Sequence, residues 1–431
     1  MRYSNTKKIR FLFVSLITSI LLTSCIEQVN IDTENFEDLL VIEAILTTEN
    51  KKHQVRISRS FSFEDSTAVK ESKAIVTLQD NENNIFPFNE TTPGVYESVE
   101  NFSPKTDLTY QLKITTANNN SYTSNFVQPT KSLAIENIYA ESMINDNDEL
   151  GLGIFVDTKN SPDQPVFVKY EFDETFRLQP PFWSPFTAIP SDNELGYEVV
   201  LKEEDVKDEI CYLTESSRNI LLTNTENQSI NIIKRFQVRF LNVGDHRLHS
   251  RYSINVKQIN QSRDTYKFYE LLNKLSDPDN IFSQLQPGFI EGNLIPETNP
   301  DEKVVGLFSI SSVDNKRIFV NFEDFFPNQN TPEYIRSCSI KDITPDQDRL
   351  LERLKNAETA DEIDELVALI RKDITARIPG LIRNRNLRFF AEVNLTFGEI
   401  KIFNPLPTMV PEACGDCRIF GTNVRPDFWE D

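Results

Sequence analysis

The first part of the chain alternates apolar and polar residues in short runs, which is the pattern of strands with one buried face. Turn-forming residues such as Pro93-Gly94 and Asn118-Asn119-Asn120 separate these runs at intervals of about ten residues. Because regularly spaced short strands are typical of antiparallel sandwiches, we predict an immunoglobulin-like β-sandwich over residues 39–130. The expected strands are 39–47, 53–60, 73–80, 94–98, 108–116 and 121–127.

Residues 131–431 are also rich in strand patterns, and we predict that they form a second, larger β-sandwich. One helix is expected within it at 262–276, where Ser262 can act as the N-cap and Asp277-Pro278-Asp279 ends the pattern. Since strand patterns follow, this helix is expected to pack on a sheet through Phe268, Leu271, Leu272 and Leu275. The expected strands are 134–141, 150–157, 166–172, 197–201, 230–241, 251–259, 303–312 and 316–324.

Residues 344–378 have a different pattern, which predicts a helical hairpin inserted between strands. Thr344-Pro345-Asp346-Gln347 and Thr359-Ala360-Asp361-Glu362 both match the capping box that starts a helix. The apolar residues of the second helix fall on one face: Ile363, Leu366, Val367 and Ile370. Because the outer face is charged, a solvated helical flap is the simpler interpretation, and a partner-docking element is the alternative.

Residues 1–24 have the parts of a secretory signal: a basic start, an apolar run from Phe11 to Leu22, and small residues before Cys25. A cysteine directly after Leu22-Thr23-Ser24 is what lipoprotein processing requires, so we predict that Cys25 is lipidated and anchors the chain to a membrane. Residues 25–38 would then form a polar tether. No Asp follows Cys25, so the outer membrane is expected, and the acidic tether slightly favours the cell surface over the periplasm.

Charge narrows the range of partners. Residues 1–24 contain four of the 45 Lys and Arg and none of the 66 Asp and Glu, so their removal changes the net charge from -21 to about -25. No basic cluster stands out in the sequence. Because such a polyanion repels a phosphate backbone, nucleic-acid binding is not expected.

Four further cysteines follow the expected anchor: Cys211, Cys338, Cys414 and Cys417. Exported proteins encounter oxidising conditions, so we interpret these four as structural disulfides, with three possible connectivities that the sequence leaves open. Cys414-Gly415-Asp416-Cys417 also has the C-x-x-C spacing of redox and zinc sites. A second close cysteine pair is lacking, which makes zinc the weaker interpretation.

The sequence contains few signs of catalysis. His246 and His249 lie beside an expected strand, where their spacing would direct them to opposite faces rather than to one metal ion. The acidic segment 145–149 is interpreted as a hairpin turn in preference to a calcium loop. No serine-hydrolase, zincin or P-loop motif is present, so neither a catalytic residue, a metal nor a cofactor is expected.

One segment is a candidate binding loop. Prolines at 180, 181 and 185 prevent a regular strand, while Phe182, Trp183 and Phe186 still require a surface to pack against. Such a loop either folds back on its own sandwich or presents rigid aromatic contacts to a ligand or protein. Phe325 and Phe326 are expected to act in the same way from a neighbouring loop.

Several stretches resemble a Bacteroidota lipoprotein family known as domain of unknown function 4249. They include LVIEAILTTENKKHQVRISRS, RYSINVKQINQSRDTYKFYELLNKL, VVGLFSISS and the ending CGDCRIFGTNVRPDFW. The resemblance implies an outer-membrane lipoprotein, often encoded beside a TonB-dependent receptor, and it supplies no catalytic residues. The implied role is an accessory subunit of that receptor.

These expectations lead to one main hypothesis and two alternatives. The main hypothesis is a non-enzymatic, lipid-anchored partner of a TonB-dependent transporter that helps to capture an unknown ligand. The first alternative is a structural or assembly subunit of outer-membrane or secretion machinery. The second is a hydrolase at the cell surface.

Overall fold

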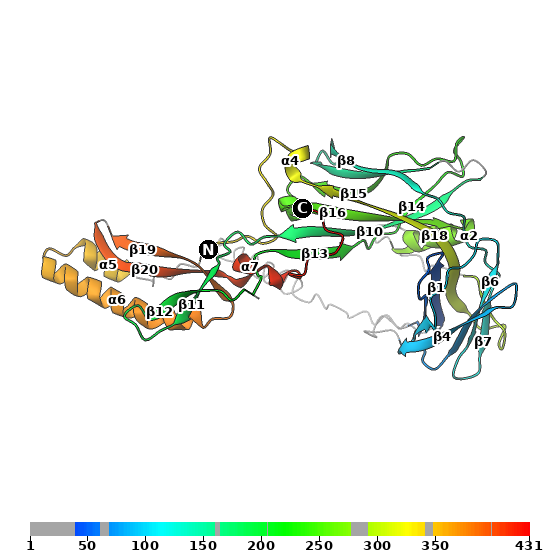
Figure 1. Ribbon diagram of the computed structural model, residues 1–431, viewed down its shortest axis with the longest axis horizontal. Coiled ribbons are helices and arrows are strands. Elements are labelled where there is room, and N and C mark those ends of the chain that lie inside the picture. The colour runs from blue at the N-terminus through cyan, green and yellow to red at the C-terminus, as the bar shows by residue number, and fades with distance from the viewer. Residues whose placement is uncertain are drawn as a thin grey trace, which may run out of the picture.

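The computed structural model describes residues 39–60, 69–159, 164–204, 206–276, 292–340, 348–397 and 399–431. Within these ranges the protein is mainly β, as predicted, and its buried apolar residues form three separate clusters. The molecule is elongated: an N-terminal sandwich lies at one end, a central sandwich in the middle, and a third unit, here called the arm, projects from the other end (Figure 1). The predicted signal, Cys25 and the tether lie outside the described residues.

The N-terminal sandwich is a single sheet that curls around its own core. Its strand order is β18-β1-β2-β5-β4-β3-β6-β7-β17. The sheet nearly closes, because the amide of Asn293, just before β17, bonds both backbone groups of Phe308 in β18 at 2.7 and 2.8 Å. The strands are β1 (Leu40–Thr47), β2 (Gln54–Arg59), β3 (Ile75–Asp80), β4 (Ile85–Thr92), β5 (Val95–Ser98), β6 (Tyr110–Thr115), β7 (Ser121–Ser124), β17 (Leu294–Pro296) and β18 (Val304–Val320).

Strand β18 belongs to two units at once, which corrects two predictions. The expected strands 303–312 and 316–324 are one strand, and its first half pairs with β1 in parallel, from Leu40↔Val304 to Thr47↔Ser311. The N-terminal core therefore also includes Leu294, Val304, Phe308 and Ile310, which lie outside the predicted 39–130. Strand β4 was also missed, because Pro87 interrupts its pattern. Local patterns do not reveal pairing between strands that are more than 250 residues apart.

The central sandwich packs two sheets face to face. One sheet has the order β13-β10-β16-β18, with β14 also paired to β10, and the other has the order β15-β9-β8. The second half of β18 pairs antiparallel with β16, so one continuous strand connects the two sandwiches. The elements are β8 (Ile135–Ile144), β9 (Leu150–Thr158), β10 (Phe167–Leu178), β13 (Cys211–Ser216), β14 (Leu221–Asn224), β15 (Phe236–Asn242), η1 (His246–His249), β16 (Tyr252–Gln261) and α4 (Phe322–Phe325).

Helix α2 (Arg263–Ser276) confirms the predicted helix but not its predicted face. Ser262 caps it, since its Oγ accepts a hydrogen bond from the Thr265 backbone N–H at 3.2 Å. The buried residues are Thr265, Tyr266 and Tyr269, whereas Leu271 is 42% exposed. Tyr266 packs on Phe167 of β10 with ring centroids 5.3 Å apart, so the two tyrosines are the large side chains that α2 buries, while Phe268, Leu272 and Leu275 are only partly buried.

The arm has a core of its own, so residues 131–431 form two units and not the single predicted domain. The predicted helical hairpin supplies α5 (Asp348–Lys355) and α6 (Ala360–Ile382). Two β-hairpins cover the apolar side of α6, one of them inserted between β10 and β13. A hairpin of helices cannot bury an apolar face alone, and these strands complete its core. The hairpins are β11 (Phe186–Pro190) with β12 (Tyr197–Leu201), and β19 (Leu387–Phe397) with β20 (Ile400–Pro411).

Helix α6 begins as predicted and ends later. The Thr359 side chain accepts a hydrogen bond from the Glu362 backbone N–H at 3.2 Å, which confirms Thr359 as the N-cap. The reciprocal bond of the capping box is shifted by one residue, because the Glu362 carboxylate accepts from the Glu358 backbone N–H at 3.4 Å. The helix continues through Pro379 to Ile382, beyond the predicted end at 378. The first capping box, at 344–347, lies outside the described residues. Across the described part of the chain, none of the helices combines the length and apolar character needed to cross a bilayer.

Candidate functional site

The four cysteines meet where the arm joins the central sandwich. Cys211 pairs with Cys417 and Cys338 pairs with Cys414, with Cα–Cα distances of 5.5 and 5.7 Å. The predicted disulfides are therefore present, and the C-x-x-C cysteines bind different partners. Cys414 lies in α7 (Glu412–Gly415) and Cys417 begins η2 (Cys417–Ile419). Both disulfides tie this C-terminal turn to segments that are distant in sequence.

Buried charges reinforce this junction. Asp416 is 2% exposed, and both of its carboxylate oxygens accept hydrogen bonds from Arg418, at 2.9 and 2.7 Å. Burial alone would raise the pKa of Asp416, but the hydrogen bonds and charge of Arg418, with the charge of Arg388, lower this pKa below its usual value. Asp208, also buried, binds Lys202 Nζ at 2.6 Å. The junction is thus held by disulfides and by paired charges together.

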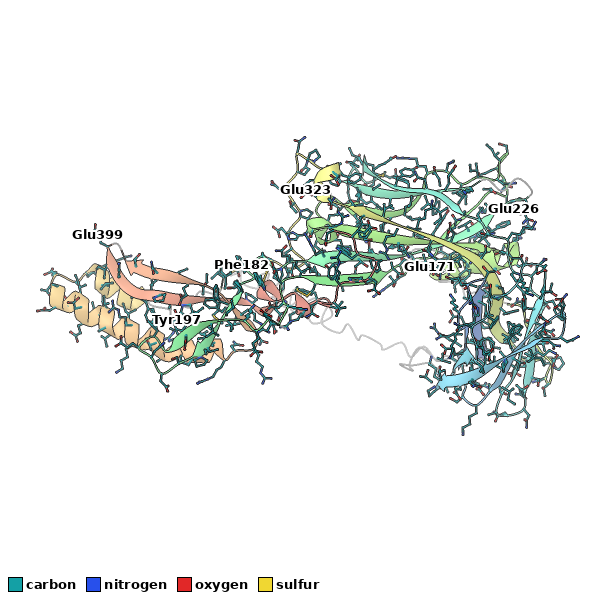
Figure 2. The ribbon with its side chains drawn as sticks, viewed as in Figure 1. Glu171, Phe182, Tyr197, Glu226, Glu323 and Glu399 are labelled. Atoms are coloured by element: carbon teal, nitrogen blue, oxygen red, sulfur yellow. A yellow bond between two sulfur atoms is a disulfide. The ribbon has the colours of Figure 1, made fainter. Side chains whose placement is uncertain are left out.

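The predicted binding loop lies mostly against this junction (Figure 2). Phe182 packs on Phe390 with ring centroids 5.1 Å apart, and Trp183 Nε1 donates a hydrogen bond to Asp208 at 2.8 Å. Phe186 differs: it is 44% exposed and pairs across β11–β12 with Leu201, which is 67% exposed. Of the two interpretations left open by the sequence, self-packing therefore describes Phe182 and Trp183, and only Phe186 presents a surface.

Phe325 and Phe326 do not extend this surface. Phe326 is 4% exposed and packs on Phe322 at 5.1 Å, and Phe325 is partly buried against the central core. Of the two interpretations left open by the sequence, self-packing therefore describes these two residues, because a short helix, α4, turns them into the sandwich.

A groove of about 950 Å³ that was not predicted opens in the central sandwich between β13–β14 and β15. At its floor, Glu174 of β10 is 4% exposed. Its carboxylate accepts two hydrogen bonds from Arg239, at 3.0 and 3.1 Å, and one from Tyr252 at 2.9 Å, and Arg247 Nε lies 3.3 Å away. Only the odd placement of Glu174 among inward-facing apolar residues of a strand could have signalled it.

The donors around Glu174 stabilise its ionised carboxylate. Burial, and then the adjacent Glu174 carboxylate, raise the pKa of Tyr252 well above its usual value, so its hydroxyl stays protonated and donates. Arg247 also binds Glu215 at 2.6 Å and Asp245 at 3.1 Å. Burial would lower the pKa of Arg247, and these carboxylates raise it. Glu174 thus has a cationic donor on each oxygen and the Tyr252 hydroxyl on Oε2, which suits a rigid groove floor better than proton transfer.

The histidines lie elsewhere. His246 and His249 lie beside a strand, as expected, because they occupy one 3-10 turn, η1, directly before β16. They are not part of an extended segment, so the strand geometry from which their opposite directions were predicted does not apply. His246 packs edge-on against Phe176 at 5.7 Å, and His249 Nδ1 lies 2.6 Å from the Pro332 carbonyl oxygen. Across the described ranges, no group of three or more His, Cys, Asp or Glu side chains is placed to hold a metal ion. Segment 145–149 forms the predicted turn, closed by Asn145 N–H to Glu149 O at 3.0 Å.

Residues 26–317 match the protein family DUF4249, described as a domain of unknown function. The match includes the N-terminal sandwich, most of the central sandwich and the β11–β12 hairpin, and it covers more than half of the chain. The protein therefore belongs to the DUF4249 family. No curated protein matches the chain.

Among solved structures, the chain is similar to a DUF4785 family protein from Legionella pneumophila, with 10% identity and a TM-score of 0.17. That similarity covers 51% of this chain and 50% of the other. A second match is trypsin-activated alpha-2-macroglobulin from Escherichia coli, with 10% identity, a TM-score of 0.16, and coverage of 53% of this chain and 15% of the other. The chain thus spans half or less of these proteins.

Proposed function

We propose that this protein is a non-enzymatic, lipid-anchored accessory subunit of a TonB-dependent transporter in the outer membrane. The resemblance to lipoproteins encoded beside such receptors suggests the partner. The observation that carries the proposal is the direction of β1, because it determines which end of the molecule lies nearest to the expected anchor at Cys25.

Strand β1 starts at the end of the molecule remote from the central sandwich. Its first residues pair in parallel with Val304, the beginning of β18, and β18 then runs into the central sandwich as far as Val320. The chain before β1 therefore enters at the far end of the N-terminal sandwich. Residues 26–38 can span at most about 45 Å when fully extended, so an anchor at Cys25 would hold this end close to the bilayer.

The central groove and the arm would then lie on the side away from the membrane. The groove offers a preformed, charge-lined recess for a ligand, and its volume is in the range usual for ligand pockets. The exposed Phe186–Leu201 pair at the base of the arm offers an apolar contact to a protein. This arrangement suits a subunit that reaches from its anchor to a neighbouring receptor.

A second candidate is a structural or assembly subunit of outer-membrane or secretion machinery. The observation that favours it is the cross-linked junction, which would hold the arm in one orientation suited to protein contacts alone.

Cross-linking in intact cells, followed by purification of the full-length lipoprotein, separates the two candidates. Recovery of a plugged outer-membrane barrel supports the transporter partnership, and recovery of only secretion or barrel-assembly components rejects it. Cys25→Ala should release the protein from the membrane fraction and abolish the cross-link. Protease treatment of intact cells determines on which side of the outer membrane the body lies.

A further inference from the structure

The central groove lies along an open side of its sandwich. Residues 237–240 of β15 line one wall, and the loop 216–219 between β13 and β14 lines the other. Strands β13 and β15 are each the last strand of their sheet, so the groove opens to solvent between two strand edges. All of its lining residues belong to the central sandwich, which makes it a site that this unit supplies alone.

The carboxylates of the groove already have arginine partners within it. Glu174 accepts hydrogen bonds from Nε and Nη2 of Arg239 at 3.1 and 3.0 Å. Arg247 donates to Glu215 at 2.6 Å and to Asp245, beside the groove, at 3.1 Å. These pairs leave two groups of cationic donors in the groove without a carboxylate: the second edge of Arg239 and the whole of Arg218.

Arg239 presents an oriented pair of donors. Its Nε–Nη2 edge is bound to Glu174, whereas Nη1 has no hydrogen-bond partner among the described residues. The side chain is only 26% exposed, and its guanidinium lies 5.7 Å from the centre of the Phe172 ring. The planar group is therefore fixed by a buried carboxylate on one edge, and its Nη1–Nη2 edge is free to bind a second carboxylate with two parallel hydrogen bonds.

The opposite wall supplies a second cation. Ser217 ties the loop to β10, because its N–H donates to the Phe172 carbonyl at 2.8 Å and its Oγ accepts from the Phe172 N–H at 3.0 Å. The next residue, Arg218, is exposed, lines the groove and has no ion-pair or hydrogen-bond partner in the described structure. An anchored loop reduces the ordering cost of a ligand that binds this arginine.

Neutral groups in the lining narrow the class of ligand. Asn219 and Gln237 are exposed on the two walls, and their side-chain amides have no hydrogen-bond partner among the described residues. Each amide can donate and accept, which matches the N–H and C=O of a peptide group. Leu221 and Phe240 add half-buried apolar surface. A small inorganic anion would use only the arginines, whereas a peptide with a free carboxylate uses all of these groups.

We propose that the central groove binds the C-terminal carboxylate of a short peptide. The carboxylate lies on the Nη1–Nη2 edge of Arg239, and Arg218 adds a second positive charge. The peptide groups bind Asn219 and Gln237, and an apolar side chain contacts Leu221. This inference rests on the role in ligand capture that is proposed above for the groove, and it names the class of ligand.

Calorimetric titration of the detergent-solubilised, full-length lipoprotein tests the site with four probes: N-acetyl-leucyl-leucine, its C-terminal amide, acetate and inorganic phosphate. The peptide acid is expected to bind at least about tenfold more tightly than each of the other three, and its affinity should fall as salt is added. Equal binding of acid and amide, or no heat from the acid at millimolar concentration, overturns the proposal. Phosphate binding as tight as that of the acid also rejects a peptide site.

Variants assign the binding to this groove. Arg218→Ala removes no described contact and should weaken the acid about threefold while leaving the amide unchanged. Adding Arg239→Lys, which keeps a positive charge beside Glu174 but removes the planar pair of donors, should raise the loss to about tenfold or more. Arg385→Ala, an exposed arginine of the arm, is the matched control and should leave binding unchanged. Unchanged affinity in the double variant, with its melting temperature preserved, contradicts the assignment.

This test is independent of the cross-linking experiment. The purified lipoprotein is titrated without a receptor, so failure to bind the peptide acid rejects the ligand class and leaves the transporter partnership standing. Failure to recover a receptor by cross-linking rejects the partnership and leaves the measured affinity of the groove unchanged.

Discussion

The N-terminal sandwich and the arm reach a buried core by different routes. The sandwich curls one continuous sheet around its core, so backbone hydrogen bonds connect nearly all of its strands. The arm has two separate hairpins and two helices, and neither hairpin pairs with the other. Both disulfides lie where the arm meets the central sandwich, and none lies in the N-terminal sandwich. Within the described residues, the disulfides are thus concentrated where the arm meets the central sandwich, a place that no continuous sheet crosses.

The difference shows how one chain stabilises two kinds of unit. A continuous sheet loses its hydrogen bonds cooperatively, so its strands support one another. Small separate hairpins are only marginally stable alone and need a packed face or a cross-link. The arm is therefore expected to be the first part to respond when contacts are removed, and the following predictions test that asymmetry, starting with the largest effect.

Reduction of both disulfides should destabilise the arm far more than the N-terminal sandwich. Each disulfide typically contributes about 2–5 kcal/mol, and both act on the same junction. Hydrogen exchange of the full chain, with and without a reductant, measures the effect at each strand. We expect β19 and β20 to lose protection while β1 and β2 keep it. Equal loss in both units would show that the stability of the arm does not depend on these links.

Ile370→Ala should lower the stability of the arm by about 2–5 kcal/mol, because the substitution leaves a cavity in its core. Ile370 is fully buried on α6, whereas its neighbour Leu369 is 46% exposed. Leu369→Ala is therefore the matched control and should change stability by less than about 0.5 kcal/mol. Thermal unfolding monitored by circular dichroism provides the measurement. Similar shifts for both variants would argue against a distinct arm core.

Asp416→Asn should destabilise the junction by about 1.5–3 kcal/mol, the usual contribution of hydrogen bonds to a charged group. The pKa of Asp416 is lower in the folded than in the unfolded state, where it is about 3.9. Its contribution to the free energy of unfolding is therefore fully present above the unfolded pKa and is lost as the pH falls through the folded pKa. The difference between wild type and variant in urea unfolding should thus be largest near neutral pH and shrink below about pH 4. Exposed Asp427→Asn is the control, and a pH-independent difference would contradict the assignment.

Thr359→Ala should have the smallest effect, a loss of about 1 kcal/mol in the arm, because it removes the hydrogen bond to Glu362 N–H. Thr359→Ser retains the hydroxyl and should restore most of the stability. Hydrogen exchange at the start of α6 reports the change locally. If alanine and serine behave alike, the cap does not stabilise the helix.

The sequence alone determined the features that depend on neighbouring residues. Most strand positions, the Ser262 cap of α2 and the Thr359 cap of α6 follow from side-chain spacing and from bonds that span three or four residues. The cysteines were also recognisable as disulfide candidates, because oxidation depends on residue type and compartment. Even within local structure, the buried face of α2 was misjudged, since the neighbouring sheet selects which side chains it covers.

Only the tertiary structure decided which distant segments meet. The parallel pairing of β1 with β18, the partners of Cys414 and Cys417, and the burial of Glu174 between Arg239 and Tyr252 all join residues far apart in the chain. Hydrophobic periodicity specifies that a face must be buried, but it does not specify the partner, because many apolar faces in one chain are chemically equivalent until the chain packs.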